Sequence, residues 1–95
     1  MTQTWTGQTI DTQYGPVQVQ LTTRSGQITD AQALQMPADT ARSQEYSSCA
    51  APQLRQEVLQ AQSANIDTAC GASYTSQGYS QSVQSAIDAW HAAGG

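Results

Sequence analysis

The chain of 95 residues contains no lysine and no phenylalanine, and only 11% of its residues are charged. Its only basic side chains other than the single histidine are Arg24, Arg42 and Arg55, and its formal net charge at pH 7 is −4. Binding to nucleic acid or to anionic membranes requires clustered cations, so the composition argues against both. A charge of this size is compatible with docking on a basic partner, but it is also ordinary for solubility.

Long apolar runs are also missing. No stretch is long enough to cross a bilayer, so we expect that this domain does not span a membrane. The first five residues have neither a basic start nor an apolar core, which means that they do not form a signal peptide. We therefore interpret Met1 as an artificial start and expect that a native leader or anchor has been removed.

Residues typical of catalytic and metal sites are scarce. The only histidine, His91, has no Ser–Asp constellation around it, so no catalytic triad is predicted, and a solvated histidine at a helix end is the simpler interpretation. The sequence contains no G-x-G-x-x-G, no P-loop and no H-E-x-x-H motif. Two cysteines without a C-x-x-C pair or a histidine cluster make a zinc site improbable. We predict no catalytic residue and no metal ligand.

The two cysteines, Cys49 and Cys70, lie 21 positions apart. In an oxidising compartment a disulfide between them is the natural interpretation, and closing a loop of this length stabilises a fold by about 3 kcal/mol. The alternative is two separate buried thiols. A thiol at Cys70 with a redox role is a further possibility, although a structural role is more common for such a residue.

A length of 95 residues predicts one domain, residues 1–95, with a modest core. The sheet region is expected over residues 3–36, with a first strand over 4–10 and a loop over 11–16. Residues 17–22 alternate between apolar and polar side chains, which is typical of a half-buried strand. A third strand over 27–36 loses its alternation near Asp30, so we predict a β-bulge there.

Two helical regions follow, at 40–62 and 76–92. Pro52 lies inside the first and predicts a kink or two short helices. The expected inward stripes are Tyr46, Cys49, Ala50, Leu54, Val58 and Ala61 in the first helix, and Tyr79, Val83, Ala86, Ile87 and Trp90 in the second. The fold class is therefore predicted as α+β: a small antiparallel meander packs Val17, Val19 and Leu21 against two helices, which a loop at 63–75 joins.

That loop carries the sequence Asp67-Thr-Ala-Cys-Gly-Ala-Ser73-Tyr-Thr-Ser76. A hydroxyl just ahead of a helix suits a phosphate, because a helix start offers unpaired N–H groups and a partial positive charge. Gly71 and Ala72 are small enough for a bulky ligand to approach the backbone. Ser73 can then hold a phosphate by a hydrogen bond or as an ester. The alternative is a plain helix-capping serine.

The same stretch resembles the signature of the FMN-binding domain family, Asp-x-x-Ser/Thr-Gly-Ala-Thr/Ser. Residues 6–21, 26–30 and 61–67 also look like that family, so the resemblance spans roughly residues 4–90. The chain departs from the common pattern at Cys70, where the family usually has Ser or Thr, and at Ser73, where Thr is commoner. The second departure keeps the hydroxyl.

The resemblance implies FMN as the cofactor, joined through its phosphate to Ser73 by a flavin transferase. It also implies that Asp67 belongs to the motif that the transferase recognises, although an aspartate here can simply stabilise a turn. Thr75 and Ser76 are candidates to donate to phosphate or ribityl oxygens, or to cap the second helix. We expect Tyr74 and Tyr14 to contact the flavin ring, since aromatic rings stack on it favourably.

The function implied is an extracytoplasmic electron-transfer domain whose redox partners are proteins in or at the membrane. It is more an electron carrier than a stand-alone enzyme. One alternative is a binding or structural module of the same fold that has lost its flavin. Another is a reductase that uses freely bound FMN, for which the sequence offers no nicotinamide-binding feature.

Overall fold

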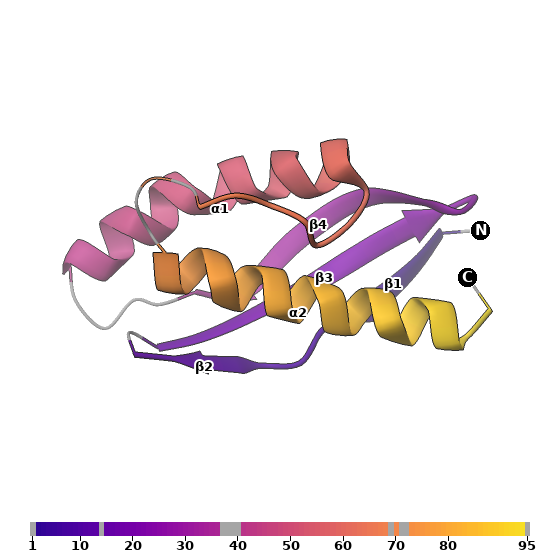
Figure 1. The fold of residues 1–95 in the computed structure, drawn as a ribbon, viewed down its shortest axis with the longest axis horizontal. Helices are drawn as coiled ribbons and strands as arrows, with labels where there is room; N and C mark the ends of the chain where they lie inside the picture. Colours follow the sequence, from indigo (N-terminus) through magenta and orange to yellow (C-terminus); the bar gives the residue numbers. More distant parts are fainter. Residues whose placement is uncertain (1, 14, 37–40, 69, 71–72, 95) are drawn as a thin grey trace.

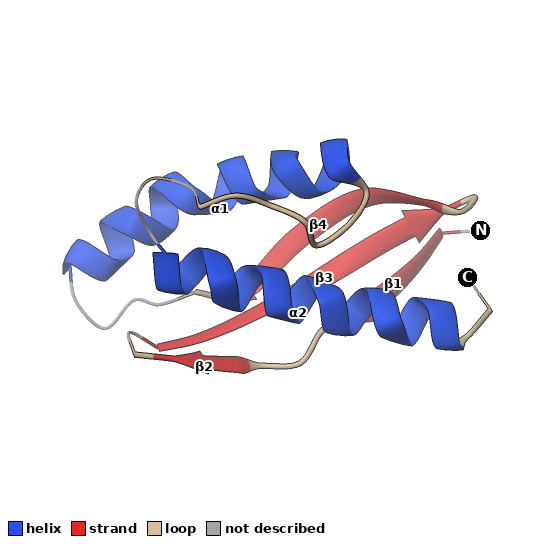
Figure 2. Cartoon of the chain, viewed as in Figure 1, coloured by secondary structure: helices blue, strands red, loops and turns tan. Residues whose placement is uncertain are grey.

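The computed structural model describes residues 2–13, 15–36, 41–68, 70 and 73–94. In chain order they form β1 (Thr2–Thr6), β2 (Ile10–Thr12), β3 (Gly15–Arg24), β4 (Gln27–Gln35), α1 (Ala41–Ala61) and α2 (Ser73–Ala92). Figure 2 shows an antiparallel sheet with both helices against it, which confirms the α+β prediction. The molecule is elongated, with extents of 40 × 22 × 18 Å, and the two chain ends lie at the same end, opposite the start of α2 (Figure 1).

β3 is the central strand, and it alone spans the sheet. β1 and β2 both pair with one edge of β3, through Trp5 opposite Leu21 and Ile10 opposite Val17, while β4 pairs with the other edge. The prediction of one unbroken strand over 4–10 was therefore wrong, because the chain leaves the ladder at residues 7–9. The predicted loop at 11–16 was also wrong in part, since β2 and the start of β3 fall within it.

The predicted bulge near Asp30 is confirmed. Thr22 lies opposite Asp30 and Thr23 lies opposite Ile28, so Thr29 is the extra residue in β4. The extra residue shifts the phase of the strand by one position. As a result, both Ile28 and Ala31 are buried although they are three positions apart.

The break between β1 and β2 is closed by α2. The Ser82 hydroxyl accepts a hydrogen bond from the Val19 N–H (2.8 Å) and donates one to the Gln8 carbonyl (2.9 Å). A side chain thus pairs backbone groups where the strand ladder is interrupted. A Cβ atom at Gly7 would clash with the Ser82 carbonyl oxygen and would lie only 2.6 Å from the Ser82 hydroxyl oxygen, so the close approach of α2 requires glycine at this position.

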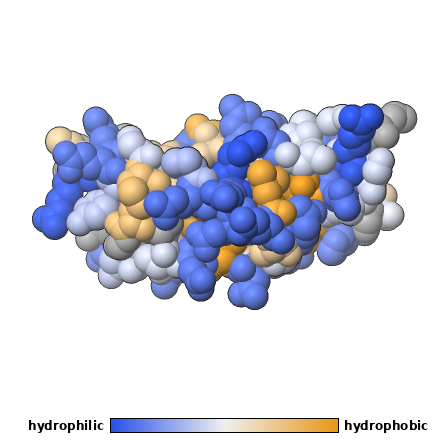
Figure 3. All heavy atoms as spheres, turned by 90° about the horizontal axis from the view of Figure 1, so that it is seen from above, coloured by the Kyte–Doolittle hydropathy of each residue, from blue (hydrophilic) through white to orange (hydrophobic). Residues whose placement is uncertain are grey.

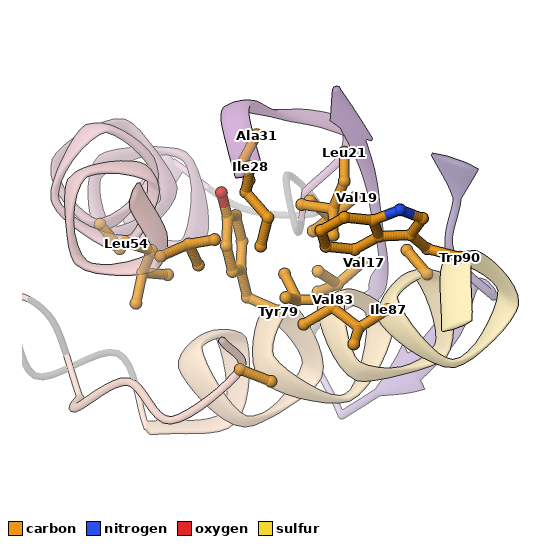
Figure 4. Packing of buried hydrophobic residues seen from close by; sticks show 14 residues of the cluster. Val17, Val19, Leu21, Ile28, Ala31, Leu54, Tyr79, Val83, Ile87 and Trp90 are labelled. Atoms are coloured by element: carbon orange, nitrogen blue, oxygen red, sulfur yellow. The ribbon is translucent and has the colours of Figure 1, made fainter. Parts of the chain in front are cut away.

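The core lies between the sheet and the two helices (Figure 4). The buried apolar residues are Val17, Val19, Leu21, Ile28, Ala31, Ala50, Leu54, Val58, Ala64, Tyr79, Val83, Ala86, Ile87 and Trp90. The alternating side chains of β3 and the predicted stripe of the second helix are all among them. Three residues that were expected on the inward stripe of the first helix, Tyr46, Cys49 and Ala61, are instead exposed, Tyr46 at 37%. The face of the molecule seen in Figure 3 is largely hydrophilic, with smaller apolar areas between polar ones.

α1 is one continuous helix, so the predicted alternative of two short helices was wrong, while the other alternative, a kink at Pro52, stays a prediction. Pro52 cannot donate the backbone hydrogen bond to residue 48, but both positions are exposed and the Ser48 carbonyl can bond to water instead. The end of α1 is fixed to β4 by Gln62. Its amide side chain accepts a hydrogen bond from the Ile28 N–H at 2.7 Å and donates one to the Ile28 carbonyl at 2.9 Å. Neither helix of the described residues has the length and apolar character needed to cross a membrane.

Tyr79 is the largest fully buried side chain of the core. Its hydroxyl has no hydrogen-bond partner among the described residues. Burial raises the pKa of the Tyr79 hydroxyl to about 12, and the nearby Arg55 charge offsets only part of this rise. The group is therefore a neutral O–H at any physiological pH.

We predict that Ser82→Ala lowers the free energy of unfolding by about 2 kcal/mol, because it leaves the buried Val19 N–H without a partner. Urea denaturation measures the loss. The matched control is Ser85→Ala, which removes a hydroxyl that bonds to the exposed Gln8 N–H and is expected to cost less than about 1 kcal/mol. Equal losses in the two variants would contradict the bridging role of Ser82.

We predict that Tyr79→Phe does not destabilise the protein at pH 7, because it removes a buried hydroxyl that has no hydrogen-bond partner among the described residues. The raised pKa gives a second readout. Above pH 10 the unfolded wild-type chain loses the Tyr79 proton before the folded chain does, so wild-type stability should fall by about 2–3 kcal/mol up to pH 12. Tyr79→Phe should lack this loss in urea unfolding across that pH window.

The exposed Tyr46 provides the control for this experiment, because Tyr46→Phe removes a hydroxyl outside the core. A loss of more than about 1 kcal/mol in Tyr79→Phe at pH 7 would show that the Tyr79 hydroxyl has a hydrogen-bond partner in solution.

Candidate functional site

Ser73 is the first residue of α2 and is exposed to solvent. The helix thus begins three residues earlier than the predicted start at residue 76. Its first turn contains no acidic residue, so no carboxylate there competes with an anion for the partial positive charge of the helix start. Of the other predicted site residues, Gly71, Ala72 and Tyr14 lie outside the described residues.

The three residues after Ser73 differ in their surroundings. Tyr74 is 48% exposed, so part of its side chain faces solvent. Thr75 and Ser76 are both buried, at 5% and 4% exposure. The structure therefore brings Ser73 and Tyr74 together at the surface and places Thr75 and Ser76 in the first turn beneath it.

A groove runs along α2 from the motif. It has a volume of about 250 Å³ and is lined by Ile66, Thr68, Ser76, Gln77, Ser80 and Gln81, which we call the motif groove. Its four helical residues follow Ser73 by three, four, seven and eight positions, which places them on the same face of the helix as Ser73. A ligand held at Ser73 therefore meets a surface of hydroxyl and amide groups with one apolar wall at Ile66.

The loop that forms the far wall of the motif groove is fixed at two points. The Ser80 hydroxyl donates a hydrogen bond to the Ala64 carbonyl at 2.7 Å, which ties the loop to α2. The Asp67 N–H donates one to the Glu57 carboxylate at 3.0 Å, which ties it to α1. Asp67 is exposed and is not one of the residues that line the groove.

A disulfide joins Cys49 of α1 to Cys70, three residues before Ser73, with a Cα–Cα distance of 6.1 Å. The disulfide prediction is confirmed, and the alternative of two separate thiols is excluded for this structure. Cys70 has a φ of 55°, in the left-handed region that non-glycine residues seldom adopt. The cross-link therefore holds Cys70 in a conformation that the backbone alone would disfavour.

A comparison with known protein families supports the resemblance drawn from the sequence. The model of a family described as FMN-binding domain matches residues 13–88, which is most of the chain.

The chain belongs to the FMN-binding domain family.

FMN is accordingly the cofactor of this domain, and the matched segment includes both the motif and the motif groove. A search of curated proteins returned no match.

The residues present fit FMN. An exposed hydroxyl at a helix start suits the phosphate, and the hydroxyl and amide groups of the motif groove suit a polyhydroxyl chain. Among the described residues no cluster of His, Cys, Asp or Glu is arranged to hold a metal ion.

Sequence reasoning missed the groove residues Gln77, Ser80 and Gln81. A signal for them was present, because their spacing from Ser73 is that of one helix face. It could be used only once the helix was known to begin at Ser73. The contact between Glu57 and Asp67 had no comparable signal, since it depends on how the loop returns along α1.

We predict that replacing both cysteines by serine, as Cys49→Ser with Cys70→Ser, lowers the free energy of unfolding by about 3 kcal/mol. The loss arises because the unfolded chain is no longer constrained by the cross-link. Urea denaturation of the double variant, and of the wild-type protein with and without reductant, measures it. An unchanged midpoint in the double variant would mean that the cross-link does not stabilise the fold.

Proposed function

We propose that FMN is attached covalently through its phosphate to the Ser73 hydroxyl and that the domain serves as an extracytoplasmic electron carrier. The observation that carries the proposal is the exposure of Ser73 at the first position of α2, next to the motif groove. An ester at this position points a ligand into solvent and along the groove, without displacing a core residue.

Each neighbouring residue has a defined part in this proposal. The first turn of α2 stabilises the negative charge of the phosphate through its N–H groups. Ser76, Gln77 and Ser80 orient the ribityl chain by hydrogen bonds, and the exposed Tyr74 offers a ring for stacking. FMN, when bound, supplies the redox chemistry, and the protein supplies binding and orientation.

Two further arguments support the proposed extracytoplasmic location and the proposed role as an electron carrier. The Cys49–Cys70 disulfide is favoured in an oxidising compartment, which supports a site outside the cytoplasm. A covalent tether prevents loss of the cofactor in such a place. An open groove leaves the flavin accessible to redox partner proteins, which suits an electron carrier better than an enzyme with its own enclosed substrate pocket.

The test is an intact-mass spectrum of the protein produced together with a flavin transferase. We expect a gain equal to FMN less one water, because the ester joins the hydroxyl to the phosphate. Ser73→Ala should lose this gain, whereas the matched variant Ser73→Thr should keep it, since threonine retains the hydroxyl. If neither the wild-type protein nor Ser73→Thr gains this mass, FMN is not attached covalently, and the alternative of a flavin-less binding module is favoured.

A further inference from the structure

The Tyr79 hydroxyl is a buried group that has no role in the proposed attachment of FMN. The side chain leaves α2, crosses the core and ends between Leu54 of α1 and Ala31 of β4 (Figure 4). Folded proteins rarely leave a buried hydroxyl without a partner, because the loss of water is not compensated. Among the described residues it is the one buried side-chain group in this condition. Such an exception points to a ligand.

A cavity lies at this point between α1 and β4. It has a volume of about 290 Å³, near the lower end of the range for small-molecule pockets. Some of its walls are short apolar residues and others are polar side chains. We call this cavity the α1–β4 slot; it is lined by Asp30, Ala31, Gln32, Ala33, Ala51, Pro52, Arg55 and Tyr79. The short apolar walls suit the flat body of a ring, and the polar groups suit one edge of it.

The charges in the slot cancel. Arg55 Nε donates to Asp30 Oδ1 at 2.6 Å, and the same oxygen accepts the Ala31 N–H at 2.8 Å. The second Asp30 oxygen and the terminal nitrogens of Arg55 have no hydrogen bond among the described residues. Both side chains are about half exposed, at 46% and 50%, so they can move to admit a ligand. A neutral ligand is favoured over a charged one, because an added charge would face this neutral pair.

We propose that the α1–β4 slot binds neutral planar compounds through a carboxamide or lactam edge. The carbonyl oxygen of that edge accepts hydrogen bonds from Tyr79 and Arg55, and its N–H donates one to Asp30. A ketone leaves the Asp30 oxygen unpaired, and a carboxylate places like charges together. A carboxamide or lactam edge can accept hydrogen bonds from Tyr79 and Arg55 and donate one to Asp30 at the same time.

The same edge occurs in two sources. One is a free amide, lactam or nucleobase-like compound. The other is the pyrimidine end of the flavin that this protein would carry, and this source alone rests on the proposed function. The protein produced without a flavin transferase tests the binding chemistry independently of that function.

The experiment is a titration of the nitrogen-labelled full chain, without attached flavin, followed by amide NMR shifts. The probes are benzamide, acetophenone and benzoate, which share a phenyl ring and differ in the polar edge. We expect benzamide to shift the amide signals of Ala31, Ala33 and Ala51 and to bind at least about tenfold more tightly than the other two probes. Tyr79→Phe should weaken benzamide binding about tenfold, while Tyr46→Phe should leave it unchanged.

Ala51→Leu provides a second variant, because a larger side chain fills the slot while the Tyr79 hydroxyl stays. It should abolish binding. Repeating the titration with flavin-bearing protein separates the sources: unchanged binding assigns the slot to a free compound, and lost binding assigns it to the flavin's own edge. Absent shifts at the slot, equal affinity for the three probes, or unchanged affinity in Tyr79→Phe would each overturn the proposal.

Discussion

The contact between α2 and the interrupted edge of the sheet is the constraint on which the rest of the molecule depends. Ser82 supplies hydrogen bonds that the chain between β1 and β2 cannot make, and Gly7 leaves the room for it. This contact fixes how closely α2 approaches the sheet at the break. Because α2 carries both Ser73 and Tyr79, it also fixes the proposed attachment point at one end of the helix and the core tyrosine six residues further along it.

Much of the fold could be predicted from local pattern alone. The alternation over 17–22 identified β3 because one face of that strand is buried and the other is not. The loss of phase near Asp30 identified a bulge for the same reason. β2 could not be predicted, because its three residues are held by pairing with the start of β3 and carry little pattern of their own. The unbroken path of α1 through Pro52 depends on solvent exposure, which a sequence does not display.

The candidate site divides in a similar way. Ser73 could be proposed from the motif, and the disulfide could be predicted because Cys49 and Cys70 are the two cysteines of the chain. The motif groove was not, because it needs the return of residues 63–68 along α2, set by the Ser80–Ala64 contact. The surroundings of the Tyr79 hydroxyl could not be predicted, because a tyrosine on the apolar face of a helix is expected to be an ordinary core residue. Only the three-dimensional structure shows that its hydroxyl is buried without a hydrogen-bond partner among the described residues.

The placement of both chain ends opposite Ser73 has a practical consequence (Figure 1). A helix of twenty residues is about 30 Å long, so the full length of α2 separates the motif from the end of the molecule that bears the termini. A tag, a dye or a solid support joined to either terminus would leave the motif facing outward. Molecules captured on an electrode in this way would all present the same pole to the solution.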